Sequence, residues 1–280
     1  EDLKLKIQKI MNKTNIAFWG LGKHSEKLLP IISKNKHLQL FGVCSRNIDI
    51  LKKISDKYEC FAWNNPSEML NNKNLDVIYI SLPIAVHSKA IVQSIKHNKH
   101  VWCEKPLTNS HLNTKKCVML AEENGKSISE GFMYLYHPQF LKFKELIKSL
   151  DRISILCSFG IPMLENPGFR HNKLLGGGAF WDIGCYPISL ITEIFLRKNL
   201  KLSSSKIIFD EKLNIDVEGF ALFNGHNCSR AYIEWAYGKS YKNEISVWSK
   251  EKNIFSKYIF SKPSNYDSTI IIHDLYGKKK

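Results

Sequence analysis

The sequence predicts an N-terminal α/β domain with a doubly wound parallel sheet, followed by an α+β domain with a mostly antiparallel open sheet. In the first half, short apolar segments alternate with helix-like segments, a pattern typical of a parallel sheet covered on both faces. In the second half, strand-like segments follow one another with turns between them. Because 280 residues exceed one average domain, we expect two domains, residues 1–130 and 131–280.

The strands of the first domain are expected to be short and apolar, since both faces of the sheet would be buried. They are expected at Asn15–Trp19, Leu38–Cys44, Phe61–Trp63, Asp76–Leu82, His100–Cys103 and Ser127–Glu130. The intervening helices are expected at Ser25–Ile32, Ile48–Lys57, Ala85–Lys96 and Asn109–Asn124.

The second domain is expected to begin with a helix, Pro138–Leu150, and to contain one other strong helix, Tyr186–Leu196. Its strands are expected at Ile153–Phe159, Ser205–Phe209, Val217–Phe223, Ala231–Trp235, Glu244–Trp248, Ile254–Phe260 and Thr269–His273. Strands in succession without helices between them favour antiparallel pairing.

The formal net charge of +15 raises the question of nucleic-acid binding. Only five of the 41 basic residues are Arg, whereas proteins that read bases rely on the Arg fork. Because the Lys residues are spread along the whole chain, we expect a solvated basic surface and no nucleic-acid partner. A positive field that attracts anionic ligands such as phosphates is the alternative.

The seven Cys residues include no CxxC pair, and several lie in apolar segments such as Gly42–Cys44 and Val101–Cys103. They are expected to be free thiols in a reducing compartment, with no metal site. No apolar run approaches the ~20 residues of a membrane span, and the first residues lack the apolar core of a secretory signal. We therefore expect a cytoplasmic protein with no membrane partner.

The segment Gly20-Leu21-Gly22-Lys23-His24-Ser25 follows a predicted strand and opens a predicted helix. This is the context of a dinucleotide-binding fingerprint, in which the glycines allow a tight turn and let a pyrophosphate approach the helix N-terminus. Gly20, Gly22, Lys23 and His24 are therefore candidate cofactor contacts. Ser25 stands at the third small position of the fingerprint. The alternative is an ordinary glycine-rich turn.

The next predicted strand ends in Cys44-Ser45-Arg46, with no acid before Asp49. NAD-binding domains usually place an acid near this point for the ribose 2′-hydroxyl, whereas Ser and Arg suit a 2′-phosphate. Ser45 and Arg46 therefore favour NADP(H), with NAD(H) still possible. The alternative for Arg46 is an exposed loop residue.

Polar and proline residues follow two later strands of the predicted sheet. Because ligands bind at the carboxyl ends of parallel strands, these residues are expected to line the cofactor crevice: Ser81, Leu82, Pro83, His87, Glu104, Lys105 and Pro106. Lys105 would be partly desolvated there and suited to proton chemistry, with Pro106 fixing the turn. The alternative for Glu104 and Lys105 is a surface ion pair.

Three glycines, residues 176–178, lead into the helix that carries Asp182 and Tyr186. Residues four apart share a face of an α-helix, and a Tyr close to a Lys can donate a proton to a carbonyl. We expect both side chains to take part in catalysis and substrate binding. Asp182 could also, or instead, be the N-cap of this helix.

Together these stretches resemble the glucose–fructose oxidoreductase/inositol dehydrogenase family, Gfo/Idh/MocA. The matching pieces are AFWGLGKHSEK, YISLPIAVHSKAI, HVWCEKPL and GGGAFWDIGCYPIS, within residues 14–273. The resemblance implies a Rossmann domain followed by an α+β domain whose open sheet binds substrate and forms oligomer contacts. It also implies that Lys105 is catalytic and that Asp182 and Tyr186 take the family's later acid and proton-donor positions.

A narrower resemblance, to nucleotide-sugar 3-ketoreductases, lies in Glu130–Gln139, in Phe159–Pro162 and at Leu135, where other branches carry Arg. Arg170 also fits that branch and is a candidate substrate contact. The resemblance implies an NADP(H)-dependent reductase of a sugar-type ketone that forms a homo-oligomer. In it Tyr186 would protonate the alkoxide, Lys105 would polarise the carbonyl, and Asp182 would orient sugar hydroxyls or Lys105.

Other functions stay open at this point. The nearest is a dehydrogenase of a free polyol, cyclitol or dihydrodiol. A further one is an NADP(H) sensor without chemistry, which would need neither Lys105 nor Tyr186.

Overall fold

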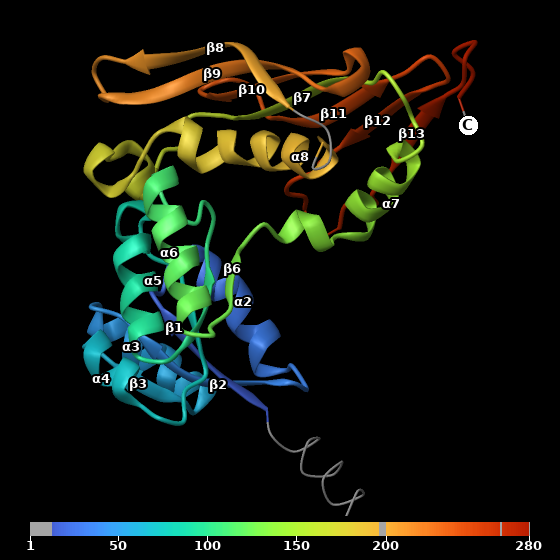
Figure 1. Cartoon of the computed structure of the whole chain (residues 1–280). Coiled ribbons are helices and arrows are strands. Elements are labelled where there is room, and N and C mark those ends of the chain that lie inside the picture. Colours follow the sequence, from blue (N-terminus) through green and yellow to red (C-terminus); the bar gives the residue numbers. More distant parts are fainter. Residues whose placement is uncertain (1–12, 196–199, 264, 280) are drawn as a thin grey trace, which may run out of the picture. The chain divides into compact units, whose positions relative to one another are not determined.

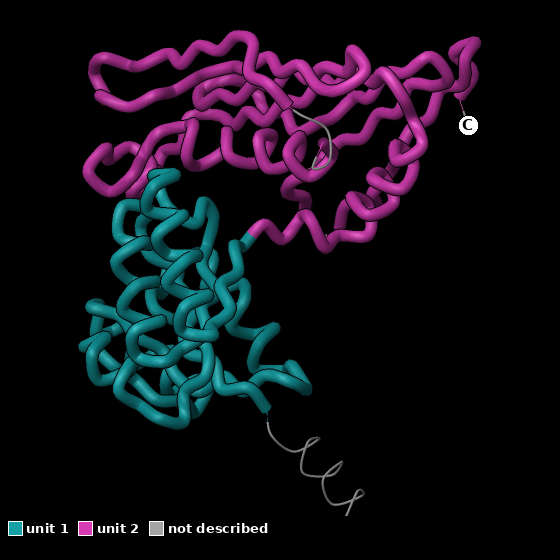
Figure 2. Tube along the Cα trace, viewed as in Figure 1, with its two compact units in different colours: residues 1–131 teal, residues 132–280 magenta. Residues whose placement is uncertain are grey.

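The computed structural model describes residues 13–195, 200–263 and 265–279. The chain divides into two compact units, residues 1–131 and residues 132–280 (Figure 2). Each unit has its own sheet and its own buried hydrophobic side chains.

Unit 1 is the predicted doubly wound α/β fold. Its six-stranded sheet has the order β3-β2-β1-β4-β5-β6, and every neighbouring pair is parallel. The strands are β1 Thr14–Trp19, β2 Leu38–Cys44, β3 Phe61–Trp63, β4 Val77–Ile80, β5 His100–Cys103 and β6 Ile128–Glu130. The order reverses next to β1, so the carboxyl ends of β1 and β4 form the switch point where such sheets bind ligands.

Helices cover both faces of this sheet. They are α2 Lys23–Ser33, α3 Ile48–Tyr58, α4 Pro66–Asn71, α5 His87–Lys96 and α6 His111–Glu123. Leu29 of α2 and Leu51 of α3 pack in one buried cluster, and Ile91 of α5 and Ala121 of α6 pack in another. The sequence did not predict α4, whose six residues are too few to show a helical period.

Unit 2 contains a seven-stranded sheet of order β13-β12-β11-β7-β10-β9-β8. The strands are β7 Ser154–Ile161, β8 Lys201–Asp210, β9 Ile215–Asn224, β10 Arg230–Tyr237, β11 Lys242–Trp248, β12 Asn253–Lys257 and β13 Ile270–His273. Every neighbouring pair is antiparallel except β7 with β10. The prediction of a mostly antiparallel sheet is therefore confirmed.

Two helices lie on one side of this sheet, α7 Pro138–Ile147 and α8 Cys185–Phe195. Figure 1 shows α8 running along the sheet, where Leu190 and Ile191 are fully buried against its inner face. Leu196, the predicted end of this helix, lies outside the described residues. Side chains on the opposite face remain exposed, among them Leu156 at 58% and Trp248 at 63%.

The stretch Lys173–Phe195 is long and apolar enough to cross a membrane by length and composition alone. In the structure, 61% of its apolar window is buried inside unit 2. Burial of this kind is what a core helix shows, so the stretch gives little support to a membrane span.

Candidate active site

The turn between β1 and α2 is shaped for a close backbone approach. Gly20 has φ +101°, and a Cβ there would lie 2.3 Å from the carbonyl oxygen of Ser81. Only glycine fits this position, where the turns that follow β1 and β4 touch. Ser25, at the third small position, is buried and donates a hydrogen bond to the carbonyl of Gly20 at 2.9 Å.

The N-terminus of α2 suits an anionic ligand. Gly22 is its N-cap, and no side chain caps the helix. Apart from its chain neighbours and the backbone of its own helix, no atom of the described residues lies within 4 Å of the point where a Cβ of Gly22 would stand. The amides and the positive dipole end of this eleven-residue helix therefore fit a pyrophosphate.

The residues after β2 keep Arg46 available for a ligand. The hydroxyl of Ser45 accepts a hydrogen bond from the amide of Asn47 at 3.1 Å, which shapes the turn. Arg46 is exposed and forms no ion pair within the described part of the chain. A guanidinium in this position suits the 2′-phosphate of NADP(H).

Glu104, directly before Lys105, is held by two residues from other elements. The hydroxyl of Tyr79 donates to its Oε1 at 2.6 Å, and Nε2 of His24 lies 3.1 Å from the same oxygen. Burial opposes ionisation of Glu104, but His24, Tyr79 and the charge of Lys105 outweigh it and lower the pKa. The sequence did not indicate Tyr79, because a Tyr inside an apolar strand reads as core.

His87 is buried between the turns that follow β4 and β5. It is 1% exposed, with Nδ1 2.9 Å from the carbonyl oxygen of Pro106 and Nε2 2.8 Å from that of Leu82. Burial is the main cause that lowers its pKa. Backbone carbonyls face both ring nitrogens, and the direct contact of His87 with a cofactor stays a prediction. His87 joins the turn after β4 to the turn after β5.

In unit 2, Asp182 is the centre of a buried polar cluster. It is 3% exposed, and its Oδ2 accepts hydrogen bonds from Nε of Arg170 at 2.7 Å and from the hydroxyl of Tyr237 at 2.8 Å. It lies inside a π-helical turn, Phe180–Gly184, whose N-cap is Ala179. The N-cap alternative for Asp182 is therefore wrong.

Two members of this cluster were not indicated by the sequence. Tyr237 lies at the end of β10, and burial followed by the charge of Asp182 raises its pKa. Oδ2 of Asp216 accepts the amide of Phe180 at 2.5 Å, and its Oδ1 lies 2.0 Å from where a Cβ of Gly178 would stand. Asp216 falls just outside the predicted strand Val217–Phe223, so the strand pattern did not predict that its side chain is buried.

Tyr186 lies in the first turn of α8 and is 5% exposed. Its ring packs against Phe132, Phe159 and Phe260. The prediction that one α-helix carries Asp182 and Tyr186 needs a correction, because the π-helical turn ends at Gly184 and α8 begins at Cys185. Lys105 belongs to unit 1 and Tyr186 to unit 2.

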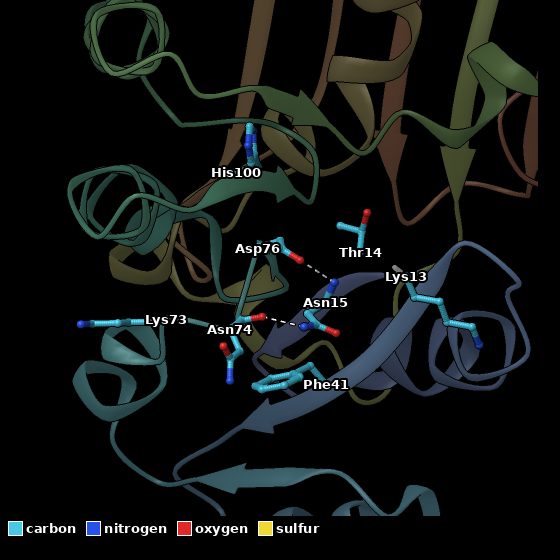
Figure 3. A pocket seen from close by; sticks show the side chains of 8 residues that line it. All are labelled: Lys13, Thr14, Asn15, Phe41, Lys73, Asn74, Asp76 and His100. Atoms are coloured by element: carbon cyan, nitrogen blue, oxygen red, sulfur yellow. Dashed lines mark hydrogen bonds between the residues drawn. The ribbon is translucent and has the colours of Figure 1, made fainter. Parts of the chain in front are cut away.

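A cavity of about 710 Å³ lies at the opposite, amino end of the strands of unit 1 (Figure 3). The amide of Asn15 donates to Asp76 there at 2.8 Å, and its side chain donates to the carbonyl of Asn74 at 2.6 Å. Since these polar groups already have partners and lie far along the strands from the glycine turn, the cavity is not the candidate site.

The fold and the glycine turn together define a nucleotide-binding oxidoreductase class. Residues 14–132 match the Gfo/Idh/MocA family model, described as an oxidoreductase family with an NAD-binding Rossmann fold. The family model thus covers the Rossmann domain of unit 1, and the predicted resemblance to this family is confirmed.

The relatives extend over both units. A dTDP-3,4-didehydro-2,6-dideoxy-alpha-D-glucose 3-reductase of Saccharopolyspora spinosa is 25% identical over 88% of this chain and 75% of its own length. A D-xylose 1-dehydrogenase (NADP(+)) of Haloferax volcanii is 28% identical over 61% of this chain and 53% of its own. KijD10, a 3-ketoreductase of Actinomadura kijaniata solved with NADP and TDP-benzene, has a TM-score of 0.88 at 24% identity, covering 94% of this chain and 82% of that one. This last likeness shows the fold.

Proposed function

We propose that the protein reduces the ketone of a nucleotide-linked keto-sugar with NADPH. The observation that carries the proposal is the Glu104-Lys105-Pro106 turn, held at the carboxyl end of the parallel sheet next to a glycine turn that fits a pyrophosphate. The Saccharopolyspora spinosa relative, which matches 88% of this chain, is by its name a reductase of a dTDP-linked sugar.

In this proposal unit 1 binds the cofactor and unit 2 binds the sugar. The N-terminus of α2 and Gly22 would hold the pyrophosphate, and Ser45 with Arg46 would hold the 2′-phosphate. The turn at Ser81-Leu82-Pro83 lies against Gly20, so it would border the same cofactor. When bound, NADPH supplies the hydride for the ketone carbon.

The proton for the new hydroxyl comes from the chain's own side chains. The Tyr186 hydroxyl would donate its proton to the oxygen as the carbonyl becomes an alkoxide. The ammonium of Lys105 would polarise the carbonyl and stabilise the developing negative charge. Asp182 would orient sugar hydroxyls, with Arg170 and Tyr237 fixing its carboxylate.

The direct test is turnover. The purified chain should oxidise NADPH when a dTDP-linked keto-sugar is added. The loss of NADPH fluorescence measures this oxidation, and chromatography should show the reduced sugar. The alternative, a dehydrogenase of free sugars, polyols or dihydrodiols, is favoured by the Haloferax volcanii relative. Reduction of NADP⁺ by D-xylose or a polyol, with no turnover of the keto-sugar, would select that alternative.

We also propose that the exposed face of the unit 2 sheet is a homo-oligomer contact of a cytoplasmic enzyme. Leu156 and Trp248 are largely exposed on this face, and the rings of Phe220 and Tyr232 stack beside them. Apolar side chains gathered on one face of a sheet usually meet a partner. Leu156→Lys should shift the mass in light scattering to that of one chain, whereas Leu141→Lys, exposed on α7, should not.

A further inference from the structure

The turn that carries Lys105 is held on both sides by residues of four different elements. Before Lys105, Glu104 is bound by Tyr79 of β4 and lies beside His24 of α2. After it, the carbonyl of Pro106 faces His87 of α5. One residue further, the amide of Leu107 donates to Oε1 of Glu130 at 2.6 Å.

Glu130 of β6 holds the turn on the far side of Lys105. It is the last residue of β6 and pairs in register with Cys103, the last residue of β5. Glu130 therefore lies opposite Cys103, which precedes Lys105 by two residues, and its side chain extends to the amide of Leu107, two residues after Lys105. The charge of Lys105 lies close enough to act on the titration of Glu130.

The feature of Glu130 that a glutamine could not replace is its negative charge. Burial raises the pKa of Glu130, and the Leu107 amide and Lys105 oppose that rise only in part. A glutamine would accept the same hydrogen bond without the cost of burying a charge. The sign follows from linkage: a carboxyl group with a raised folded-state pKa stabilises the fold less as pH rises and it ionises. The carboxylate therefore costs stability, and what it adds beyond an amide is negative charge beside Lys105.

We infer that Glu130 is a positioning residue for Lys105: it fixes the backbone of the turn through Leu107 and keeps the lysine protonated through its negative charge. This inference rests on the proposed function for the role of Lys105, but its main test does not require turnover. In the described part of unit 1, the other titratable groups that face Lys105 or its neighbours are Glu104, His87 and Cys103, together with Tyr79 and His24 through Glu104.

The experiment measures the protonation of Lys105 directly. The whole chain is labelled with acetic anhydride across a range of pH, and the Lys105 peptide is quantified by mass spectrometry. Lys105 is only half-buried, which leaves it within reach of the reagent. In Glu130→Gln the pH midpoint for labelling Lys105 should fall by about one pH unit, because a negative charge that interacts with the Lys105 ammonium has been removed. Glu123→Gln, an exposed acid at the end of α6, is the matched control and should leave the midpoint unchanged.

Two further readouts separate positioning from a structural role. Thermal melts at neutral pH should show Glu130→Gln as stable as the wild type or more so, while the basic limb of the pH profile for NADPH oxidation shifts down with the labelling midpoint. Glu130→Asp, which keeps the charge, should return the midpoint toward that of the wild type even where Glu130→Gln folds poorly.

A midpoint that stays unchanged in Glu130→Gln, or that falls equally in Glu130→Asp, overturns the inference. If the wild type does not turn over any keto-sugar, the proposed function fails. The labelling result still decides whether Glu130 sets the charge of Lys105.

Discussion

The Lys105 turn of unit 1 and the Asp182 cluster of unit 2 are built in opposite ways. Lys105 lies in a continuous motif, Glu104-Lys105-Pro106, whose position at a strand end already indicates chemistry. The Asp182 cluster is made of residues from separate elements. Tyr237, for example, lies 55 positions from Asp182 along the chain. The comparison teaches that a sequence motif identifies the reactive residue, whereas the groups that hold it come from strands whose side-chain directions only the fold reveals.

The strongest test of this comparison removes one reactive group from each unit. Lys105→Ala and Tyr186→Phe should each lower kcat about 10²–10⁴-fold, since general acid catalysis is worth about that much. The double variant should be little worse than the more damaged single one, because residues that act as a unit share their effect. NADPH affinity should survive in Tyr186→Phe. The measurement is a double-mutant cycle on kcat with a keto-sugar.

Thermal melts of each variant provide the fold control for this cycle. If Lys105→Ala keeps nearly normal kcat, the Glu104–Lys105 pair is a structural ion pair, and the assignment of the site is wrong. If the losses in kcat were fully additive, Lys105 and Tyr186 would act independently of each other.

Prediction from sequence worked best where a short apolar run has clear ends. Leu38–Cys44, Phe61–Trp63 and His100–Cys103 are strands with the predicted bounds. The prediction erred where local backbone geometry intervenes. The strand predicted to run from Ile254 to Phe260 ends at Lys257, because Tyr258 takes φ +51°.

The candidate site was predictable only in part for a related reason. Gly20 and Lys105 belong to motifs whose meaning is local. His87 was placed in the same crevice because it follows a strand, but its ring is turned inward between two carbonyl groups. Asp216 and Tyr237 show no local pattern, since their buried polar atoms find partners in the π-helical turn, at Phe180 and Asp182, far away along the chain.

Arg46, like Lys105, belongs to a local motif. Its proposed role requires only the cofactor phosphate and no other side chain, so it contrasts most clearly with the dispersed Asp182 cluster. Arg46→Ala should weaken NADPH binding by about 1.5–3 kcal/mol through the lost contact with a phosphate. NADH binding should hardly change, because NADH carries no 2′-phosphate. Titration of both cofactors by fluorescence measures the difference, with Lys52→Ala, exposed on α3, as the control. Equal losses for the two cofactors would contradict the assignment.

Tyr237 tests the dispersed cluster. Tyr237→Phe removes the hydroxyl that donates to Asp182 and should cost about 1.5 kcal/mol of folding free energy, because the acceptor is a buried carboxylate. Denaturant unfolding should show this loss, together with a raised KM for the keto-sugar. Tyr241→Phe should lose much less, because Tyr241 is 43% exposed. If both variants unfold at the same denaturant concentration, Tyr237 does not hold Asp182.

The smallest effect concerns the pH dependence of the Lys105 turn itself. Burial opposes the charge of Glu104, yet His24, Tyr79 and Lys105 together lower its pKa. A carboxylate with a depressed folded-state pKa stabilises the fold above its unfolded pKa of about 4.3, and that stability is lost as pH falls through the folded-state value. Glu104→Gln should therefore be less stable than the wild type at neutral pH by about 1 kcal/mol, since the amide keeps the Tyr79 hydrogen bond without the charge.

This difference between the wild type and Glu104→Gln should shrink steadily as melts are repeated from neutral pH to below about pH 4. Glu145→Gln is the matched control: its carboxylate pairs with Lys142 but is 69% exposed, so water screens the pair and its removal should change little at any pH. The same small difference at every pH in Glu104→Gln would mean that His24 and Tyr79 do not favour the charged form. The turn would then be held by its backbone contacts at Pro106 and Leu107 rather than by the ionised carboxylate before Lys105.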